Sequence, residues 1–146
     1  DATLRRNKQY PLYFSQIWLL CHFLLSTPIL PHKNIPQLQD VEIIKIIVVP
    51  GEDLELILTL DTSELPEKLP LKWLDRKVNT VQIELDFIGV RIINFNIDNG
   101  SNYCFSIESL RENEYIIILT NKANCDKIKF EARWAYIKNI SGYTKE

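Results

Sequence analysis

The chain has 146 residues, 46% of them hydrophobic, and its 17 basic and 19 acidic residues give a formal net charge of −2. This length is typical of one domain, and a chain of this size buries about 68–70% of its unfolded surface. The hydrophobic fraction excludes intrinsic disorder for most of the chain, and the balanced charge gives no electrostatic basis for nucleic-acid binding. Because methionine is absent, even at position 1, we expect a processed or trimmed product.

The N-terminal part of the chain contains an apolar segment that predicts a helix. No Asp, Glu, Lys or Arg occurs in Gln9–Pro31, and its densest part is Ile17–Leu25. Basic residues before this run imitate a secretory signal, but the run is far shorter than the about 20 residues that a membrane helix needs. We therefore predict that residues 1–35 form an apolar helical segment, with the helix at about Leu12–Leu25, packed on a β domain of residues 36–146.

After Pro36 the hydrophobic period changes to two, which is typical of strands with one buried face. Strands are indicated over Val41–Val49, Leu54–Asp61, Val81–Phe87, Ile93–Ile97, Tyr103–Ile107, Tyr115–Leu119 and Lys127–Tyr136. The turn residues 98–102 predict a hairpin between the strands that flank them. Short polar connections favour antiparallel neighbours, because parallel neighbours need a crossover of about a dozen residues or more. We therefore predict a mainly β fold, an antiparallel sheet or two-layer β-sandwich of six to seven strands with one N-terminal α-helix.

Acidic residues are concentrated in the stretch from Ile46 to Glu67. This stretch has six acids and no base: Glu52, Asp53, Glu55, Asp61, Glu64 and Glu67. The alternation places Asp53, Glu55 and Asp61 on the polar face of one strand, and therefore in water. One interpretation is an ordinary hydrated face. The other is an acidic docking surface for a basic partner, because complementary charge steers protein association.

The residue pattern offers little basis for catalysis. The sequence has two histidines and four scattered glycines, and no hydrolase, metalloprotease or nucleotide-binding motif. Glu84 and Asp86 form a carboxylate pair on one strand face, but such a face is normally hydrated. The three cysteines are widely spaced and lack a C-x-x-C pair, which indicates reduced thiols, although a Cys104–Cys125 disulfide stays open in an oxidising compartment. We predict no enzyme, no cofactor and no metal site.

Several short motifs occur in a fixed order along the chain. They are Pro36–Ile43, Pro70–Trp73, Asn79–Gln82, Phe87–Val90, and a closing stretch from Phe130–Ala132 to Ile140–Tyr143. Together they resemble the bacterial immunity protein 50 family over residues 36–143. Members of that family typically open the first motif with Pro-Ser-Phe-His-Asp-Ala-Glu, whereas this chain has Leu38 in place of the aromatic residue and Gln39 in place of the histidine.

The resemblance implies a cytoplasmic immunity protein of a polymorphic toxin system, which binds a cognate toxin and neutralises it without catalysis. Neither nucleic acid nor a membrane is then expected as a partner. The candidate partner-binding residues, from the motifs and the acidic stretch, are Asp40, Glu42, Asp53, Glu55, Asp61, Glu64 and Trp73. One alternative is a small-ligand or carbohydrate-binding β domain, in which Trp18, Trp73 and Trp134 line a pocket. Another is an exported or membrane-associated β domain anchored by residues 10–31.

Overall fold

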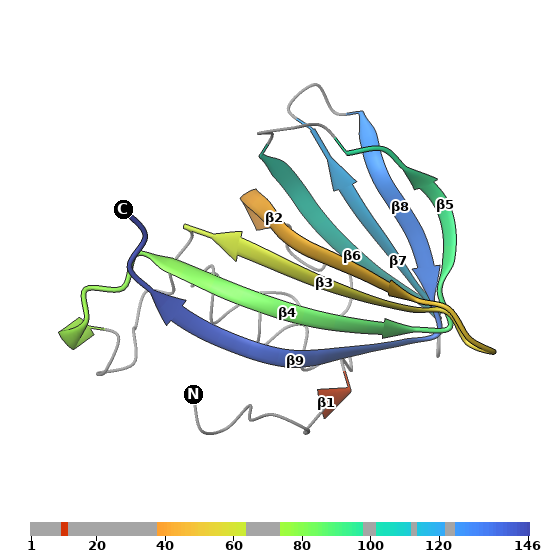
Figure 1. Ribbon diagram of the computed structural model, residues 1–146. Helices are drawn as coiled ribbons and strands as arrows, with labels where there is room; N and C mark the ends of the chain where they lie inside the picture. The colour runs from red at the N-terminus through yellow and green to blue at the C-terminus, as the bar shows by residue number, and fades with distance from the viewer. Residues whose placement is uncertain (1–9, 12–37, 64–73, 98–101, 112–113, 122–124) are drawn as a thin grey trace.

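The computed structural model describes residues 10–11, 38–63, 74–97, 102–111, 114–121 and 125–146. Within these residues, nine strands form one antiparallel sheet in the order β1-β9-β4-β3-β2-β6-β7-β8-β5 (Figure 1). The strands are β1 Tyr10–Pro11, β2 Leu38–Val49, β3 Glu55–Thr62, β4 Thr80–Ile88, β5 Arg91–Phe95, β6 Tyr103–Arg111, β7 Glu114–Thr120, β8 Asp126–Ala132 and β9 Trp134–Tyr143.

The mainly β, antiparallel fold predicted from the sequence is confirmed. The helix predicted at Leu12–Leu25 lies outside the described residues. In the part of the chain that the structure describes, no helix has the length and apolar character needed to cross a membrane.

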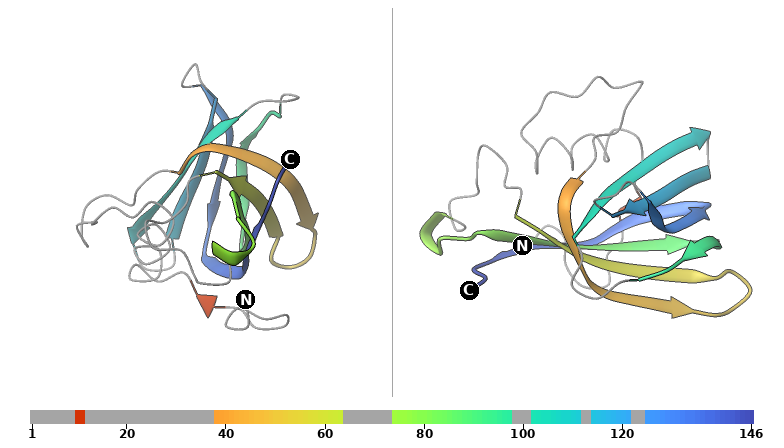
Figure 2. Two further views of the ribbon diagram at one scale, coloured as in Figure 1. Left: turned by 90° about the vertical axis from the view of Figure 1, so that its left-hand side faces the viewer. Right: turned by 90° about the horizontal axis from the view of Figure 1, so that it is seen from above.

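The sheet folds over on itself into two layers (Figures 1 and 2). One layer holds β1, β9, β4, β3 and β2, and the other holds β6, β7, β8 and β5. β2 joins the layers: it pairs with β3 from Val41 to Val49, but with β6 only through Leu38 and Val41. Asp40, between these two pairs, has a left-handed backbone (φ 52°) at a register shift, and such a bulge bends a strand. Figure 2 shows β2 curving from one layer into the other.

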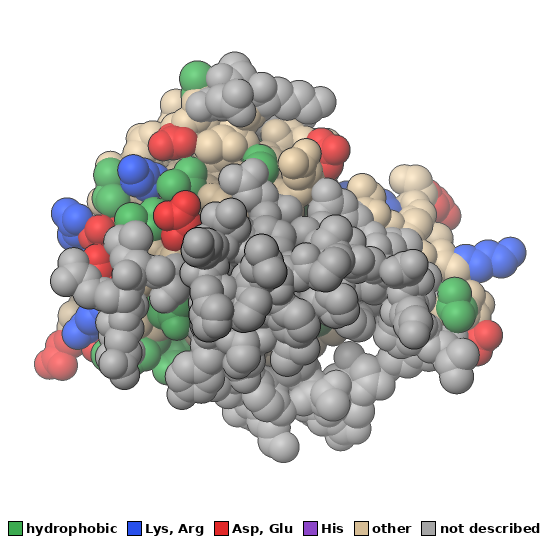
Figure 3. Space-filling model, turned by 180° about the vertical axis from the view of Figure 1, so that it is seen from behind, with side chains coloured by type: hydrophobic (Ala, Val, Ile, Leu, Met, Phe, Trp, Pro, Cys, Tyr) green, Lys and Arg blue, Asp and Glu red, His purple; other side chains and the backbone are tan. Residues whose placement is uncertain are grey.

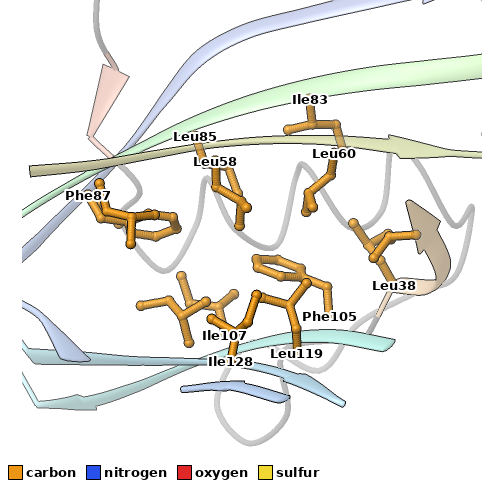
Figure 4. Packing of buried hydrophobic residues seen from close by; sticks show 14 of the residues in the cluster. Leu38, Leu58, Leu60, Ile83, Leu85, Phe87, Phe105, Ile107, Leu119 and Ile128 are labelled. Atoms are coloured by element: carbon orange, nitrogen blue, oxygen red, sulfur yellow. The ribbon is translucent and has the colours of Figure 1, made fainter. Parts of the chain in front are cut away.

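The core lies between the two layers (Figure 4). Leu58, Leu60, Ile83, Leu85 and Phe87 of β3 and β4 point toward side chains of β6, β7 and β8. The Phe87 and Phe130 rings meet edge to face, with centroids 5.0 Å apart and an interplanar angle of 75°. The alternation predicted for 81–87 is confirmed, because its hydrophobic members are all buried.

The segment predicted as one strand over Lys127–Tyr136 is two strands. The chain passes from the second layer to the first at Arg133, whose N–H donates to the carbonyl of Ile88 over 3.1 Å. The buried positions change phase there: Ala135 is buried, whereas Trp134 is 36% exposed. The prediction that even-numbered residues stay on the buried face as far as Trp134 was therefore wrong after the end of β8.

The second crossing between the layers, from β4 to β5, lies beside the first. Gly89 has φ +71°, and the Val90 N–H donates to the carbonyl of Leu54 over 3.0 Å. A Cβ added at Gly89 would lie 2.5 Å from Nε of Arg133 and 3.1 Å from its Cβ. Glycine is therefore required here by both backbone conformation and space.

Two further expectations were wrong, one about strand pairing and one about a hydrated face. The hairpin predicted across residues 98–102 does not form, since β5 pairs with β8, and β6 pairs with β2 and β7. The hydrated face predicted for β4 is also wrong at Asp86, which is fully buried, and Glu84 is half-buried.

Candidate functional site

Polar side chains from four neighbouring strands form a row near the end where the two layers diverge. The register places Glu42 of β2 opposite Asp61 of β3, Asp61 opposite Gln82 of β4, and Gln82 opposite Ser141 of β9. Directly paired residues of antiparallel strands project to the same face. Because Leu60 of β3 belongs to the core, Asp61 and the rest of this row lie on the face turned away from the core.

Asp61 is the centre of this row, and it is only 3% exposed. Its Oδ1 accepts a hydrogen bond from Nε2 of Gln82 over 3.0 Å. Its Oδ2 accepts a hydrogen bond from the hydroxyl of Tyr143, and Nζ of Lys145 lies 3.5 Å from the same oxygen. A buried carboxylate is costly unless its charge and its hydrogen-bonding capacity are both satisfied. The three partners supply both.

Lys145 joins the buried carboxylate to the surface. Its Nζ lies 2.6 Å from Oε1 of Glu42, and both side chains are about half exposed. The hydrogen bond to Glu42 raises the pKa of Lys145 above its usual value, and the charge of Asp61 adds to this effect. We call Glu42, Asp61, Gln82, Tyr143 and Lys145 the Asp61 cluster.

Tyr143 is held in its neutral form by the same arrangement. Burial raises the pKa of its hydroxyl, and the hydrogen bond to Asp61 and the carboxylate charge raise it further. Ionised Tyr143 would place two negative charges against each other. The hydroxyl is therefore a fixed hydrogen-bond donor to Asp61.

The C-terminal tail that carries Lys145 is anchored by Asn79. The Lys145 N–H donates to Oδ1 of Asn79 over 2.8 Å, and Nδ2 of Asn79 donates to the Lys145 carbonyl over 2.9 Å. The Thr144 hydroxyl reaches the carbonyls of Arg76 and Lys77, at 3.0 and 3.1 Å. These bonds fix the position from which Lys145 extends over Glu42 and Asp61.

The predicted partner-binding residues do not form a single patch. Glu42 belongs to the Asp61 cluster, and Asp61, expected in water, is buried there. Asp40 is exposed at the bulge of β2. Asp53 and Glu55 lie at the opposite end of the β2–β3 hairpin, where Asp53 pairs with Arg133. Glu64 and Trp73 lie outside the described residues.

Sequence reasoning missed most of the Asp61 cluster as a site. Asn79, Gln82 and Tyr143 belong to motifs that carried the family resemblance, but periodicity alone did not bring them together. The structure does: the motifs containing Glu42, Gln82 and Tyr143 meet around Asp61. Their joint presence in the resemblance was the signal that could have located this cluster.

The described residues contain no group of three or more His, Cys, Asp or Glu side chains arranged to hold a metal ion. Cys104 and Cys125 are not joined by a disulfide in this structure.

Comparison with known proteins identifies one family. A family model described as Immunity protein 50 matches residues 31–143, which is most of the chain. Neither the curated proteins nor the solved structures gave a match. The matched range includes Glu42, Asp61, Gln82 and Tyr143 of the Asp61 cluster, and it ends before Lys145.

Proposed function

The chain belongs to the Immunity protein 50 family, and on this premise we propose that it binds a cognate bacterial toxin and neutralises it without catalysis. The family implies an immunity protein role in general terms. The match over residues 31–143 is the observation that carries the proposal, because it spans both layers of the sheet.

The chemistry of the Asp61 cluster supports a binding protein better than an enzyme. A general acid or base must reach the proton that it transfers. Asp61 is buried, and both of its oxygens already accept hydrogen bonds from the chain's own side chains. The cluster instead holds the Glu42–Lys145 pair in a fixed position at the surface, which is how a protein presents charge to a partner at low entropic cost.

The carbohydrate-binding alternative gains no support from Trp134. The guanidinium of Arg133 lies over the Trp134 ring, 4.7 Å from its centroid. That face of the ring is therefore covered by a cation–π contact and is not open to a sugar ring. Trp18 and Trp73, the other two tryptophans considered for a pocket, lie outside the described residues.

The location that follows from the proposal is the cytoplasm of a cell that makes the toxin. An immunity protein protects such a cell when it meets the toxin there before damage occurs. The partner is then a toxin domain encoded by a neighbouring gene in a polymorphic toxin system.

The test is neutralisation of that toxin domain by the intact chain. The toxin domain is expressed in cells with or without the chain, and the affinity of the purified pair is measured by calorimetry. We expect restored growth and a stable complex, and a toxin domain from an unrelated system serves as the control. Absence of both rescue and binding would contradict the proposal.

A further inference from the structure

Among the described strands, the second half of β2 has a neighbour on one side only. β6 begins at Tyr103, opposite Val41, so no described strand continues the pairing along residues 44–49 on that side. On its other side, the same stretch pairs with β3 as far as Val49–Glu55. The backbone N–H and C=O groups of an edge strand are a template for another extended chain.

The side chains along this edge are unusually apolar for a surface. Ile44, Ile47, Val48 and Val49 are each between 39% and 44% exposed. Val48 pairs with Leu56 on the core side of the layer, whereas Ile47 pairs with Ile57 on the opposite side. A strand added here would therefore meet apolar side chains on both faces. Exposed hydrophobic side chains are also present among charged ones on the face seen from behind in Figure 3.

Acidic residues flank this apolar edge at both ends. Exposed Asp40 precedes it and exposed Glu52 follows it at the tip of the β2–β3 hairpin, each beside a second exposed acid, Glu42 or Asp53, that pairs with Lys145 or Arg133 of the same chain. Lys45 is the one base in the interval 38–63. Antiparallel self-pairing of two β2 edges centred on residues 46–47 would bring the tip acids of one copy toward Asp40 and Glu42 of the other. This like-charge contact disfavours a second copy.

We propose that the β2 edge, residues 44–49, receives an extended segment of the toxin as an added strand. The inference rests on the proposed function and specifies where the toxin binds. The segment that fits is apolar at its centre and carries Lys or Arg on both sides, because the edge is apolar between two acidic ends. Main-chain hydrogen bonds supply affinity in this mode, and the flanking charges set orientation and partner choice.

The direct test is amide hydrogen exchange on the intact chain, alone and bound to the toxin domain encoded by the neighbouring gene. An added strand protects the β2 amides that point away from β3, so we expect exchange within residues 44–49 to slow by about tenfold or more in the complex. Complex formation with unchanged exchange at these amides would overturn the inference and leave the proposed function intact. Absence of any complex would overturn both.

Paired variants identify the edge independently of exchange. Ile44→Lys with Val48→Lys places charge on the β2 edge, and we expect toxin affinity to fall by about tenfold or more. Ile93→Lys with Phe95→Lys is the matched control on β5, where the side chains are similarly exposed at 46% and 43%. Equal losses in both variants, with both chains folded by circular dichroism, would overturn the assignment to β2. If the chain alone sediments as a dimer and the β2 variant sediments as a monomer, the edge binds a second copy of the chain instead of the toxin.

Discussion

The hydroxyl of Tyr143 donates a hydrogen bond to the buried carboxylate of Asp61, across 82 residues of sequence. This bond ties the end of β9 to the end of β3, two strands that are not neighbours because β4 lies between them. A hydrogen bond to a buried charged group stabilises a fold more than a bond between neutral groups, since losing it leaves the charge unsatisfied.

Removing this hydroxyl is expected to destabilise the fold. Tyr143→Phe leaves Oδ2 of Asp61 without its hydrogen-bond donor and should lower the free energy of unfolding by about 1–3 kcal/mol. Urea denaturation measures the change. Tyr136→Phe is the matched control, because it removes a hydroxyl from a half-buried tyrosine on the same strand without touching Asp61. Equal losses in the two variants would show that the Asp61 contact contributes nothing particular.

The same contact predicts a loss of stability in alkaline solution. The pKa of Tyr143 and that of Lys145 are both raised in the folded chain. The folded state therefore holds more protons than the unfolded state above about pH 10, so these groups contribute their stability below that pH and lose it as pH rises through the folded-state pKa values. Unfolding free energies measured from about pH 8 to 11 should fall less steeply in Tyr143→Phe. Parallel curves would contradict the assignment.

The core between the layers predicts a contrast between adjacent residues of β4. Leu85 is fully buried among the core side chains, whereas Glu84 is half-buried on the other face. Leu85→Ala should cost about 2–5 kcal/mol of unfolding free energy, because truncation leaves a cavity in the core. Glu84→Ala should cost about 0.5 kcal/mol or less. Similar losses in the two variants would be inconsistent with this orientation of β4.

The corner where both chain crossings meet predicts a second contrast. Gly89→Ala should destabilise the fold by about 1–3 kcal/mol, because alanine disfavours φ +71° and its Cβ would displace the Arg133 side chain. Gly51→Ala is the control, since its added Cβ would lie 3.6 Å from the nearest atom, the Asp53 carbonyl oxygen. Thermal unfolding compares them. A Gly51→Ala loss as large as that of Gly89→Ala would argue against a specific requirement at the corner.

Local periodicity predicted the core-facing side of the strands correctly, but it did not predict that the opposite side is also partly buried. The alternation in 81–87 and in 54–61 correctly identified the side chains that face the core. It also predicted that the opposite faces are hydrated, yet Thr59, Asp61 and Asp86 are buried. A period of two assigns residues to one face or the other, but whether the second face is covered depends on distant parts of the chain.

Local periodicity also could not predict which strands pair or where the chain crosses between the layers. Trp134 and Tyr136 continue the even-numbered apolar pattern of β8, so the sequence gives no signal of the phase change at Arg133. The register that sets Glu42 beside Asp61 and Asp61 beside Gln82 depends on long-range pairing. The motifs of the family resemblance contain Glu42, Gln82 and Tyr143, but only the sheet topology places these residues together around Asp61.

The burial of Asp61 changes which acidic residues can be tested as toxin contacts. Asp61→Lys would place a positive charge beside Lys145 in a buried site and is expected to unfold the chain.

Glu52→Lys with Glu55→Lys instead reverses charge at the hairpin tip, where Glu52 is exposed and Glu55 half-buried. If these acids steer a basic toxin, association should slow by about tenfold at low salt and by less at high salt, because screening shortens the reach of surface charge. Asp75→Lys with Asp126→Lys is the control, because it changes the net charge equally at exposed positions elsewhere. Association rates are measured by stopped flow, and an equal fall in both variants would indicate an effect of net charge alone. Unchanged rates in the hairpin variant would exclude the tip acids from toxin capture.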